Sequence, residues 1–237
     1  MIGRSIQNNI LKMYENFKEI KSKIARGRTN VWYPLVAGET RSETRYNARF
    51  PFAGECSAVD KVKIDIGLSY NAPISRDWLQ RHDDRLVIGI EPDPTNAAKA
   101  REMSSDRFVL IEAACDYENE EKEFYHLTSG DSGCCSLFEP TPITGWEYEK
   151  IRVKTLKLSD LLEYLLTEYI FIEQIKTDTQ GNDDVILMTV EEYLPRIAFY
   201  DIEVDPPGQY EITHNSLSSA YIQRFMIEHN FILLERS

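Results

Sequence analysis

Two hydrophobic patterns alternate along the chain. Short apolar runs rich in β-branched residues predict buried strands, and they occur at residues 62–66, 86–91, 107–114, 169–178 and 196–204. Segments whose apolar residues recur every three or four positions predict helices, and they occupy residues 73–82, 94–103, 158–167, 183–194 and 217–229. A last apolar run at 231–235 predicts a final strand. Strands and helices that alternate at this spacing favour an α/β fold with a doubly wound, mostly parallel sheet.

Two other segments lack such periodicity. Residues 28–55 are expected to form loops or short helices over one edge of the sheet. Residues 128–148 contain several Gly and Pro residues and are expected to form a long loop, and loops of that length are often functional. We therefore divide the chain into an N-terminal helical or irregular extension, residues 1–55, which faces an acceptor or a partner, and a main domain, residues 56–237.

Charge is distributed unevenly along the chain. The net charge is −12, yet residues 1–30 carry seven Lys or Arg against two Glu. Apolar residues at helical spacing between Ile6 and Ile24 make this basic segment an amphipathic helix. Such a helix packs on its own domain, on a partner subunit or on an anionic membrane surface, and the sequence leaves these alternatives and the oligomeric state open. The acidic remainder should repel a phosphate backbone, so nucleic acid is not expected as a partner.

Composition predicts a cytoplasmic location. With 42% hydrophobic and 28% charged residues, the chain has the composition of an ordinary globular protein. No run approaches the roughly 18 apolar residues that a membrane span needs, and the N-terminus lacks the apolar run of a signal peptide. The four cysteines show no CxxC spacing, so we expect reduced thiols and no zinc site.

Acidic residues and a glycine stand where the first two predicted strands end. Asp65 and Gly67 follow the first strand, and Glu91 follows the second. In an open α/β sheet, ligands bind beyond the carboxyl ends of the strands. A dinucleotide needs the glycines of a GxGxxG loop for its pyrophosphate, and only Gly67 is present here.

A carboxylate at this position suits a different nucleoside. Glu91 can accept hydrogen bonds from both hydroxyls of a ribose, and these bonds are strengthened by its charge. A ribose, an ammonium group and a positive sulfur without phosphate together describe S-adenosylmethionine. Each motif alone is equally a turn signal, and the pair of carboxylates after consecutive strands favours the cofactor.

Six segments occur in an order that resembles the FkbM family of S-adenosylmethionine-dependent methyltransferases. They are DIGLSYNA (65–72), IGIEPDP (88–94), VLIEAACDYENEEKEFYHL (109–127), CCSLFEP (134–140), VKTLKLSDLL (153–162) and IKTDTQGNDDVIL (175–187). The resemblance implies a class I methyltransferase (Rossmann-like) fold, a doubly wound, mostly parallel sheet with an antiparallel C-terminal strand. It also implies O-methylation of a hydroxyl on a sugar, glycan or small natural product.

The resemblance carries site residues over to this chain. The methionine side of the cofactor would be lined by Asp65, Gly67, Ser69, Tyr70 and Asn71. The ribose would be held by Glu91 with Pro92 and Asp93 beside it, and the adenine would be bordered by Ala113 and Ala114. Asp178 would lie near the amino group or the transferring methyl.

Two positions depart from the family pattern. Asn71 stands where a glycine is usual, which a tight loop tolerates because Asn also adopts left-handed conformations. Gln180 stands where the family generally has Glu. A base or metal ligand supplied by that Glu would therefore be missing from this chain.

Methyl transfer to a hydroxyl needs alignment and a base for the departing proton. Candidates near the strand ends are Asp178, Glu203, Asp205 and His214, the last because a histidine titrates near neutral pH. A divalent ion on Asp178, Glu203 and Asp205 would also acidify the hydroxyl, but solvated acidic groups are common, so no metal is assigned.

Three alternatives stay open at this point. VDPPGQY (204–210) resembles the Asp-Pro-Pro-aromatic signature of N-methyltransferases, with Gly208 in place of the aromatic residue. Gln180 leaves room for a catalytically idle module that only binds the cofactor. A nicotinamide-dependent oxidoreductase would use Glu91 on the adenosine ribose, and the missing glycines count against it.

Overall fold

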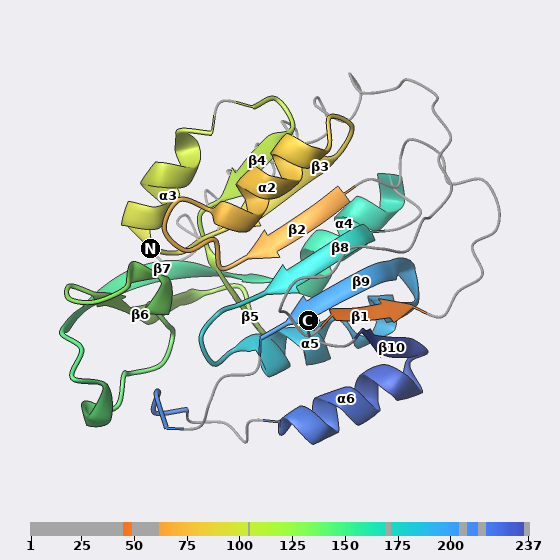
Figure 1. The fold of residues 1–237 in the computed structure, drawn as a ribbon. Helices are drawn as coiled ribbons and strands as arrows, with labels where there is room; N and C mark the ends of the chain where they lie inside the picture. Colours follow the sequence, from red (N-terminus) through yellow and green to blue (C-terminus); the bar gives the residue numbers. More distant parts are fainter. Residues whose placement is uncertain are drawn as a thin grey trace, which may run out of the picture.

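The computed structural model describes residues 45–48, 62–103, 105–168, 172–203, 208–212 and 217–234. Within these residues the strands form a seven-stranded sheet, in the order β10-β1-β9-β8-β2-β3-β4, and a three-stranded sheet, in the order β5-β7-β6 (Figure 1). The strands of the larger sheet are β1 (Arg45–Ala48), β2 (Val62–Ile66), β3 (Leu86–Ile90), β4 (Phe108–Ile111), β8 (Ile172–Thr177), β9 (Ile197–Ile202) and β10 (Phe231–Leu234). Those of the smaller sheet are β5 (Ala114–Asp116), β6 (Glu121–Leu127) and β7 (Tyr148–Lys157).

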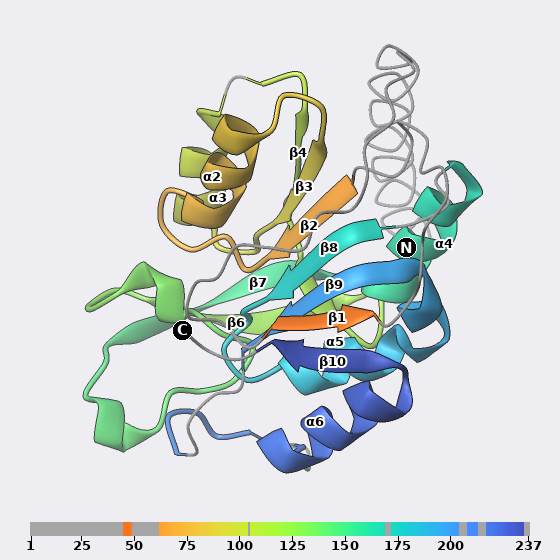
Figure 2. The same cartoon turned by 45° about the vertical axis from the view of Figure 1, so that its right-hand side comes forward.

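Helices cover both faces of the larger sheet. The α-helices of the described residues are α2 (Pro73–Arg81), α3 (Pro94–Arg101), α4 (Leu158–Glu168), α5 (Asp183–Thr189) and α6 (Ser219–Glu228). Short 3₁₀ helices are η1 (Ser132–Cys134), η2 (Pro142–Thr144) and η3 (Glu191–Arg196). Figures 1 and 2 show α2 and α3 on one face, with α4 and α5 on the other.

The central strands are parallel, as the alternating pattern predicts. β2 pairs in parallel with β3 and β8, β3 pairs with β4, and β8 pairs with β9. From β2 the chain proceeds outward through β3 and β4, then returns to place β8 on the other side of β2. The Rossmann-like, doubly wound α/β fold is therefore confirmed, and the strand order reverses between β2 and β8.

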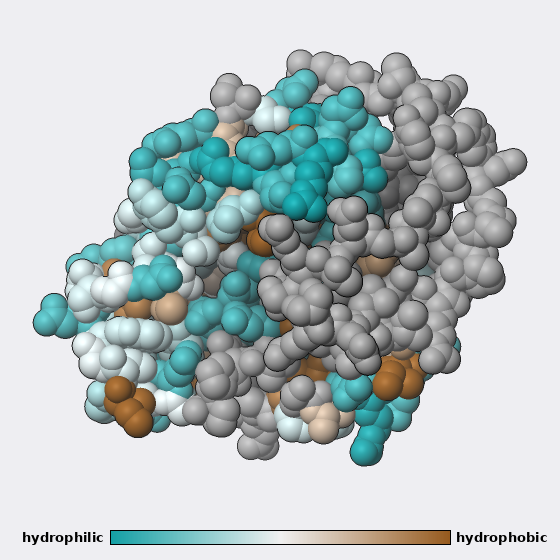
Figure 3. Space-filling view, in the orientation of Figure 1, coloured by the Kyte–Doolittle hydropathy of each residue, from teal (hydrophilic) through white to brown (hydrophobic). Residues whose placement is uncertain are grey.

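Two apolar clusters hold the helices against the sheet. On one face, Trp78 of α2 and Ala100 of α3 pack with Val87 and Phe108 of the strands. On the other face, buried side chains of α4, α5 and α6 share one larger cluster with the strands. Figure 3 shows hydrophilic residues over the outer side of α2 and α3, which fits helices with a single buried face.

The antiparallel strand of the larger sheet corrects one expectation. Arg45–Ala48 lies in segment 28–55, expected to form loops or short helices, and instead forms β1 between β9 and β10. β10 pairs antiparallel with β1, as predicted for the C-terminal strand, but β1 also pairs antiparallel with β9. The reversed strand is therefore β1, and β10 runs in the same direction as β9. Four residues are too few to show a strand period in the sequence.

The smaller sheet was not predicted. The expected strand at 107–114 ends at Ile111, and the chain enters the smaller sheet at Ala114. β6 and β7 pair antiparallel, from Glu121 opposite Lys154 to Leu127 opposite Tyr148. Half-exposed, charged strands of this kind give only a weak hydrophobic signal.

Other expectations fall outside the described residues. They include the amphipathic segment between Ile6 and Ile24 and most of the 1–55 extension, whose boundary with the main domain stays a prediction. Among the helices that are described, none combines the length and the apolar character needed to cross a membrane.

The packing of α4 yields a stability prediction. Leu162 is fully buried within the larger cluster, whereas its neighbour Glu163 is exposed. Leu162→Ala should lower the free energy of unfolding by about 2–5 kcal/mol, because it leaves a cavity under the sheet. Glu163→Ala should change it by about 0.5 kcal/mol or less. Denaturant unfolding monitored by circular dichroism measures both, and equal effects would place α4 away from the core.

Candidate functional site

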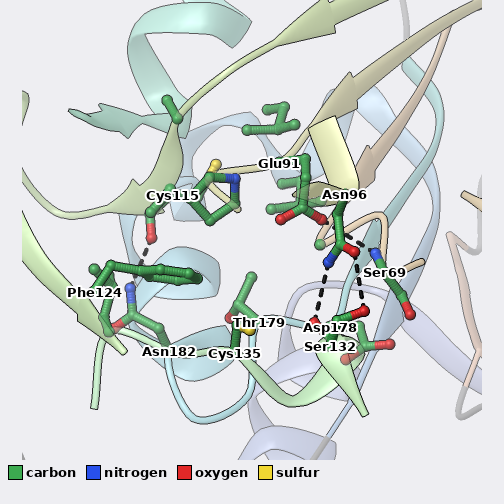
Figure 4. Close-up of a pocket in the computed structure, with 18 residues that line it drawn as sticks. Ser69, Glu91, Asn96, Cys115, Phe124, Ser132, Cys135, Asp178, Thr179 and Asn182 are labelled. Atoms are coloured by element: carbon green, nitrogen blue, oxygen red, sulfur yellow. Dashed lines mark hydrogen bonds between the residues drawn. The ribbon is translucent and has the colours of Figure 1, made fainter. Parts of the chain in front are cut away.

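A pocket lies at the carboxyl ends of β2, β3 and β8, where the strand order reverses. The space between its lining atoms is about 510 Å³, a figure that includes space open to solvent. Figure 4 shows Phe124 and Cys115 on one side of the pocket and Ser69 and Asp178 on the other. One end therefore has the aromatic ring of Phe124, with the Asn182 amide beside it, and the other end is polar.

The pocket gathers most of the predicted cofactor residues. Those that line it are Gly67, Ser69, Glu91, Pro92, Ala113, Ala114 and Asp178. The predicted residues outside the lining are Asp65, Tyr70, Asn71 and Asp93. Glu203 lies beside Asp178 outside the lining, and the candidates Asp205 and His214 fall outside the described residues.

Glu91 fastens the loop after β2 to the end of β3. Its Oε2 accepts hydrogen bonds from the backbone N–H groups of Leu68 at 2.9 Å and Ser69 at 3.1 Å. Its Oε1 accepts from the N–H of Asp93 at 2.8 Å. A carboxylate offers about four acceptor positions, so one remains for a ligand. The expected double hydrogen bond to a ribose would thus compete with the protein's own backbone.

Burial raises the pKa of Glu91 to about 8, although the three N–H donors favour the charged form. The side chain is only 4% exposed. In the neutral form its hydroxyl can donate to a ribose oxygen, and in the charged form it can only accept. Either form suits a diol.

The loop after β2 offers no cradle for phosphate. The N–H of Gly67 donates to the carbonyl of Ile90 at 3.0 Å, and those of Leu68 and Ser69 donate to Glu91. A pyrophosphate site needs such N–H groups to point at the ligand. Here they are engaged within the protein, so the geometry agrees with the absence of GxGxxG.

Asp65 acts behind the pocket rather than in its wall. It is 1% exposed, and its Oδ2 accepts from the Ser75 hydroxyl at 2.6 Å. Its Oδ1 lies 3.5 Å from Nζ of Lys176, whose ammonium group also lies 3.2 Å from Asp178 and donates to the Gly67 carbonyl at 2.7 Å. Burial raises the pKa of Asp65 despite Lys176. Asp65 thus positions Lys176, which joins the ends of β2 and β8.

Asp178 remains the acidic group of the polar end. Burial opposes its ionisation, but the Lys176 ammonium and neighbouring hydrogen bonds hold its pKa below the ordinary value. The Nε2 of Gln180 donates to Asp178 Oδ1 at 2.7 Å. The charged form of Asp178 is therefore available to a cationic ligand.

Asp93 has a structural role that the sequence did not predict. Its Oδ1 caps α3 by accepting from the N–H groups of Thr95 and Asn96, and its Oδ2 contacts Nδ1 of His126. Tyr70 is 49% exposed, and Asn71 has the predicted left-handed conformation with φ 68°. These residues shape the rim without entering the pocket wall.

Among the described residues, Asp93, His126 and Cys135 form a group that could hold a metal, with ligand atoms within 4.8 Å of one another. The three side chains already have partners within the protein, since Asp93 contacts His126 and Cys135 Sγ accepts from the N–H of Leu127 at 3.2 Å. Burial raises the pKa of Cys135 to about 12, which favours a neutral thiol. The positive end of α3 also disfavours a cation here. We assign no metal to it.

The segment around η1 covers the pocket. Asn96 donates to the carbonyl of Ser132 at 3.0 Å and accepts from the Ser132 hydroxyl at 3.1 Å. A Cβ atom on Gly133 would lie 2.6 Å from the Ser69 hydroxyl. The loop predicted at 128–148 thus contributes directly to the site, although its residues gave no pattern that identified them.

The sequence patterns did not predict several residues of the site. Lys176 carried the clearest signal, because a lysine within an apolar strand needs buried partners. Asn96, Phe124 and Asn182 gave none, since only the folded chain brings them to the pocket.

Comparisons with known proteins add little to this geometry. No protein-family model matches the chain, and curated proteins yield no significant match. Among solved structures, the chain is similar to the methyltransferase FkbM from Methylobacillus flagellatus KT, with 11% sequence identity and a TM-score of 0.36. The match covers 62% of this chain and 33% of that chain, so this chain spans about a third of that protein's length. The fold assignment stands on the sheet topology itself.

Glu91 generates a pH prediction. A folded pKa of about 8 above an unfolded value near 4.5 means that the free energy of unfolding falls as pH rises between these values. The fall contributed by Glu91 is up to about 1.4 kcal/mol per pH unit. Glu91→Gln should remove this part of the slope, as measured by urea unfolding from pH 4 to 9. Parallel curves of unfolding free energy against pH for both proteins would show that the pKa of Glu91 is the same in the folded and unfolded protein.

Gly67 generates a second prediction. Its φ is +77°, and an added Cβ would lie 1.8 Å from the carbonyl oxygen of Asp178. Gly67→Ala should therefore push the ends of β2 and β8 apart and abolish ligand binding. Gly145→Ala is the matched control, because Gly145 has φ +65° and nothing within 4 Å of an added Cβ. Calorimetry with S-adenosylhomocysteine measures the effect, and similar affinity in both variants would contradict this account.

Proposed function

We propose that the chain is an S-adenosylmethionine-dependent methyltransferase that methylates a hydroxyl on a sugar, glycan or small natural product. One observation carries the proposal: a pocket at the switch point of the sheet has acidic side chains at two strand ends, and the N–H groups of Gly67, Leu68 and Ser69 beside it are engaged within the protein. The order of sequence motifs that resembles the FkbM family supports it independently.

Three parts of the pocket support the assignment of this cofactor. Ala113, Phe124 and Leu137 provide an apolar space for a base such as adenine. Glu91 has one acceptor position toward a ribose. Asp178, kept charged by Lys176, lies where a cationic amino acid portion can approach.

When bound, S-adenosylmethionine supplies the methyl group: a bond from the acceptor oxygen to the methyl carbon forms as the carbon–sulfur bond breaks, and sulfur keeps the electron pair. The protein's part is to align the acceptor and receive its proton. Asp178 and Glu203 are the candidates for this role among the described residues. In this proposal the acceptor enters the pocket from the side of Glu203, because Glu203 is exposed beside the pocket.

The alternatives differ in what they require. An oxidoreductase needs a pyrophosphate site, which the engaged N–H groups disfavour. An N-methyltransferase would use VDPPGQY, of which residues 204–207 lie outside the described part. A catalytically idle module would bind the cofactor without turnover.

Calorimetry tests the cofactor directly. S-adenosylhomocysteine should bind the protein and NAD should not. Glu91→Gln should weaken binding at least about tenfold, because one of the positions that hold the loop becomes an N–H donor. The exposed Glu118 provides the control, and Glu118→Gln should bind as the unaltered protein does. Binding of NAD alone would overturn the proposal.

Turnover is measured with labelled methyl groups. Incorporation into hydroxyl acceptors, in a panel of glycans and small alcohols, is the expected result. Incorporation only into amines would favour N-methylation, and binding without incorporation into any acceptor would favour the idle module.

A further inference from the structure

Gln180 connects the two carboxylates at the mouth of the pocket. Its Nε2 donates to Asp178 Oδ1 at 2.7 Å and to Glu203 Oε2 at 3.0 Å. The two hydrogens of one amide group thus serve two acidic side chains, which follow the neighbouring strands β8 and β9. The side chain of Glu203 also lies within hydrogen-bonding reach of Asp178.

The other end of the amide group is held by Tyr210. The Tyr210 hydroxyl lies 3.0 Å from Gln180 Oε1 and 2.9 Å from the carbonyl of Cys134, so its one proton is shared between two acceptors. The backbone carbonyl of Gln180 accepts from the Ser136 hydroxyl at 2.7 Å. These contacts fix the orientation of the amide, with its N–H groups toward the carboxylates.

The backbone at this position is unusual. Gln180 has φ +58°, in the left-handed region, which a non-glycine residue adopts only at an energetic cost. Such strained residues persist where surrounding contacts over-determine them, and they cluster at functional sites. Here the side chain supplies the contacts that compensate.

A glutamate could not make these contacts. An ionised Glu at 180 has no donor and would place a third carboxylate against Asp178 and Glu203. Gln180 therefore departs from the family pattern in a specific way. It supplies a hydrogen-bond donor at position 180, and the acidic groups are the side chains of Asp178 and Glu203.

We propose that Gln180 is a positioning residue that holds Asp178 and Glu203 together, so that Glu203 receives the proton of the acceptor hydroxyl while Asp178 stays charged beside Lys176. In this step the hydroxyl proton moves to a Glu203 oxygen, and the acceptor oxygen keeps the electron pair with which it attacks. Asp178 faces the pocket and Glu203 faces outward, which matches a cofactor side and an acceptor side. This inference rests on the proposed function.

Charged and titratable groups surround the pair. Lys176 lies 3.2 Å from Asp178, and Asp65 lies behind Lys176. Tyr210 faces the amide group, and Asp183 of α5 acts on Lys176. Of these, the Lys176 ammonium is the cation, and its contact with Asp178 favours the charged form of Asp178, which makes Asp178 poorly suited to receive a proton. Glu203 is therefore the partner better suited to receive a proton.

Two variants separate the effect of side-chain length at position 180 from the effect of its N–H donors. Gln180→Asn keeps an amide and a residue that tolerates the left-handed backbone, but it is one methylene too short to reach both carboxylates. Gln180→Glu keeps the reach and loses the N–H donors. Gln80 of α2 is exposed, so Gln80→Asn and Gln80→Glu are the matched controls.

Carbon-13 NMR of the carboxyl groups tests the pairing without any acceptor. In the unaltered protein, Asp178 and Glu203 should titrate as a coupled pair. Gln180→Asn should move their midpoints to higher pH by about one pH unit, because the charged forms lose donors. Unchanged titrations would overturn the pairing, and the Gln80 variants should titrate as the unaltered protein does.

Kinetics then test the catalytic part. Both Gln180 variants should bind S-adenosylhomocysteine within about twofold of the unaltered protein, yet lower kcat by roughly 10–100-fold and shift the acidic limb of the pH profile. Wild-type kcat and pH profile in both variants would refute the role of Gln180 while leaving the methyltransferase proposal intact. Failure of the unaltered protein to bind the cofactor would refute that proposal, and the NMR titration would still decide whether the pair exists.

Discussion

The close contact between the ends of β2 and β8 is the constraint on which the site depends. The N–H of Asp178 donates to the carbonyl of Ile66 at 3.0 Å, and the Gly67 carbonyl accepts from the Lys176 ammonium. Only a residue without a Cβ atom fits at Gly67. The ion pairs of the buried Lys176 ammonium with Asp65 and Asp178 hold this junction, and removing Lys176 would leave the buried Asp65 side chain without its cation.

This junction explains how charge is arranged around the pocket. Asp65 is turned inward to Lys176, so it supports the site from behind. Glu91 uses two of its acceptor positions to hold the loop after β2, so the N–H groups of Leu68 and Ser69 are engaged within the protein. Asp178 keeps its charge at the pocket wall, and Gln180 connects it to Glu203. In the proposed function, binding of a nucleoside and control of a proton thus depend on adjacent strand ends.

The sequence predicted the parts of this arrangement that follow from local patterns. Apolar runs identified the parallel strands, and Asp65, Gly67 and Glu91 marked the strand ends where the pocket lies. Four-residue β1 was missed because it is too short to show a period. The inward direction of Asp65 and the partners of Gln180 depend on contacts between distant segments, which no spacing in the sequence encodes.

The most direct test of the central claim is a crystal structure of the protein with S-adenosylhomocysteine. The ligand should occupy the pocket between Gly67 and Ala114, with its ribose against Glu91 and the loop after β2 still bound to that side chain. A ligand bound elsewhere, or a pocket that stays closed by the protein's own side chains at saturating concentration, would contradict the account.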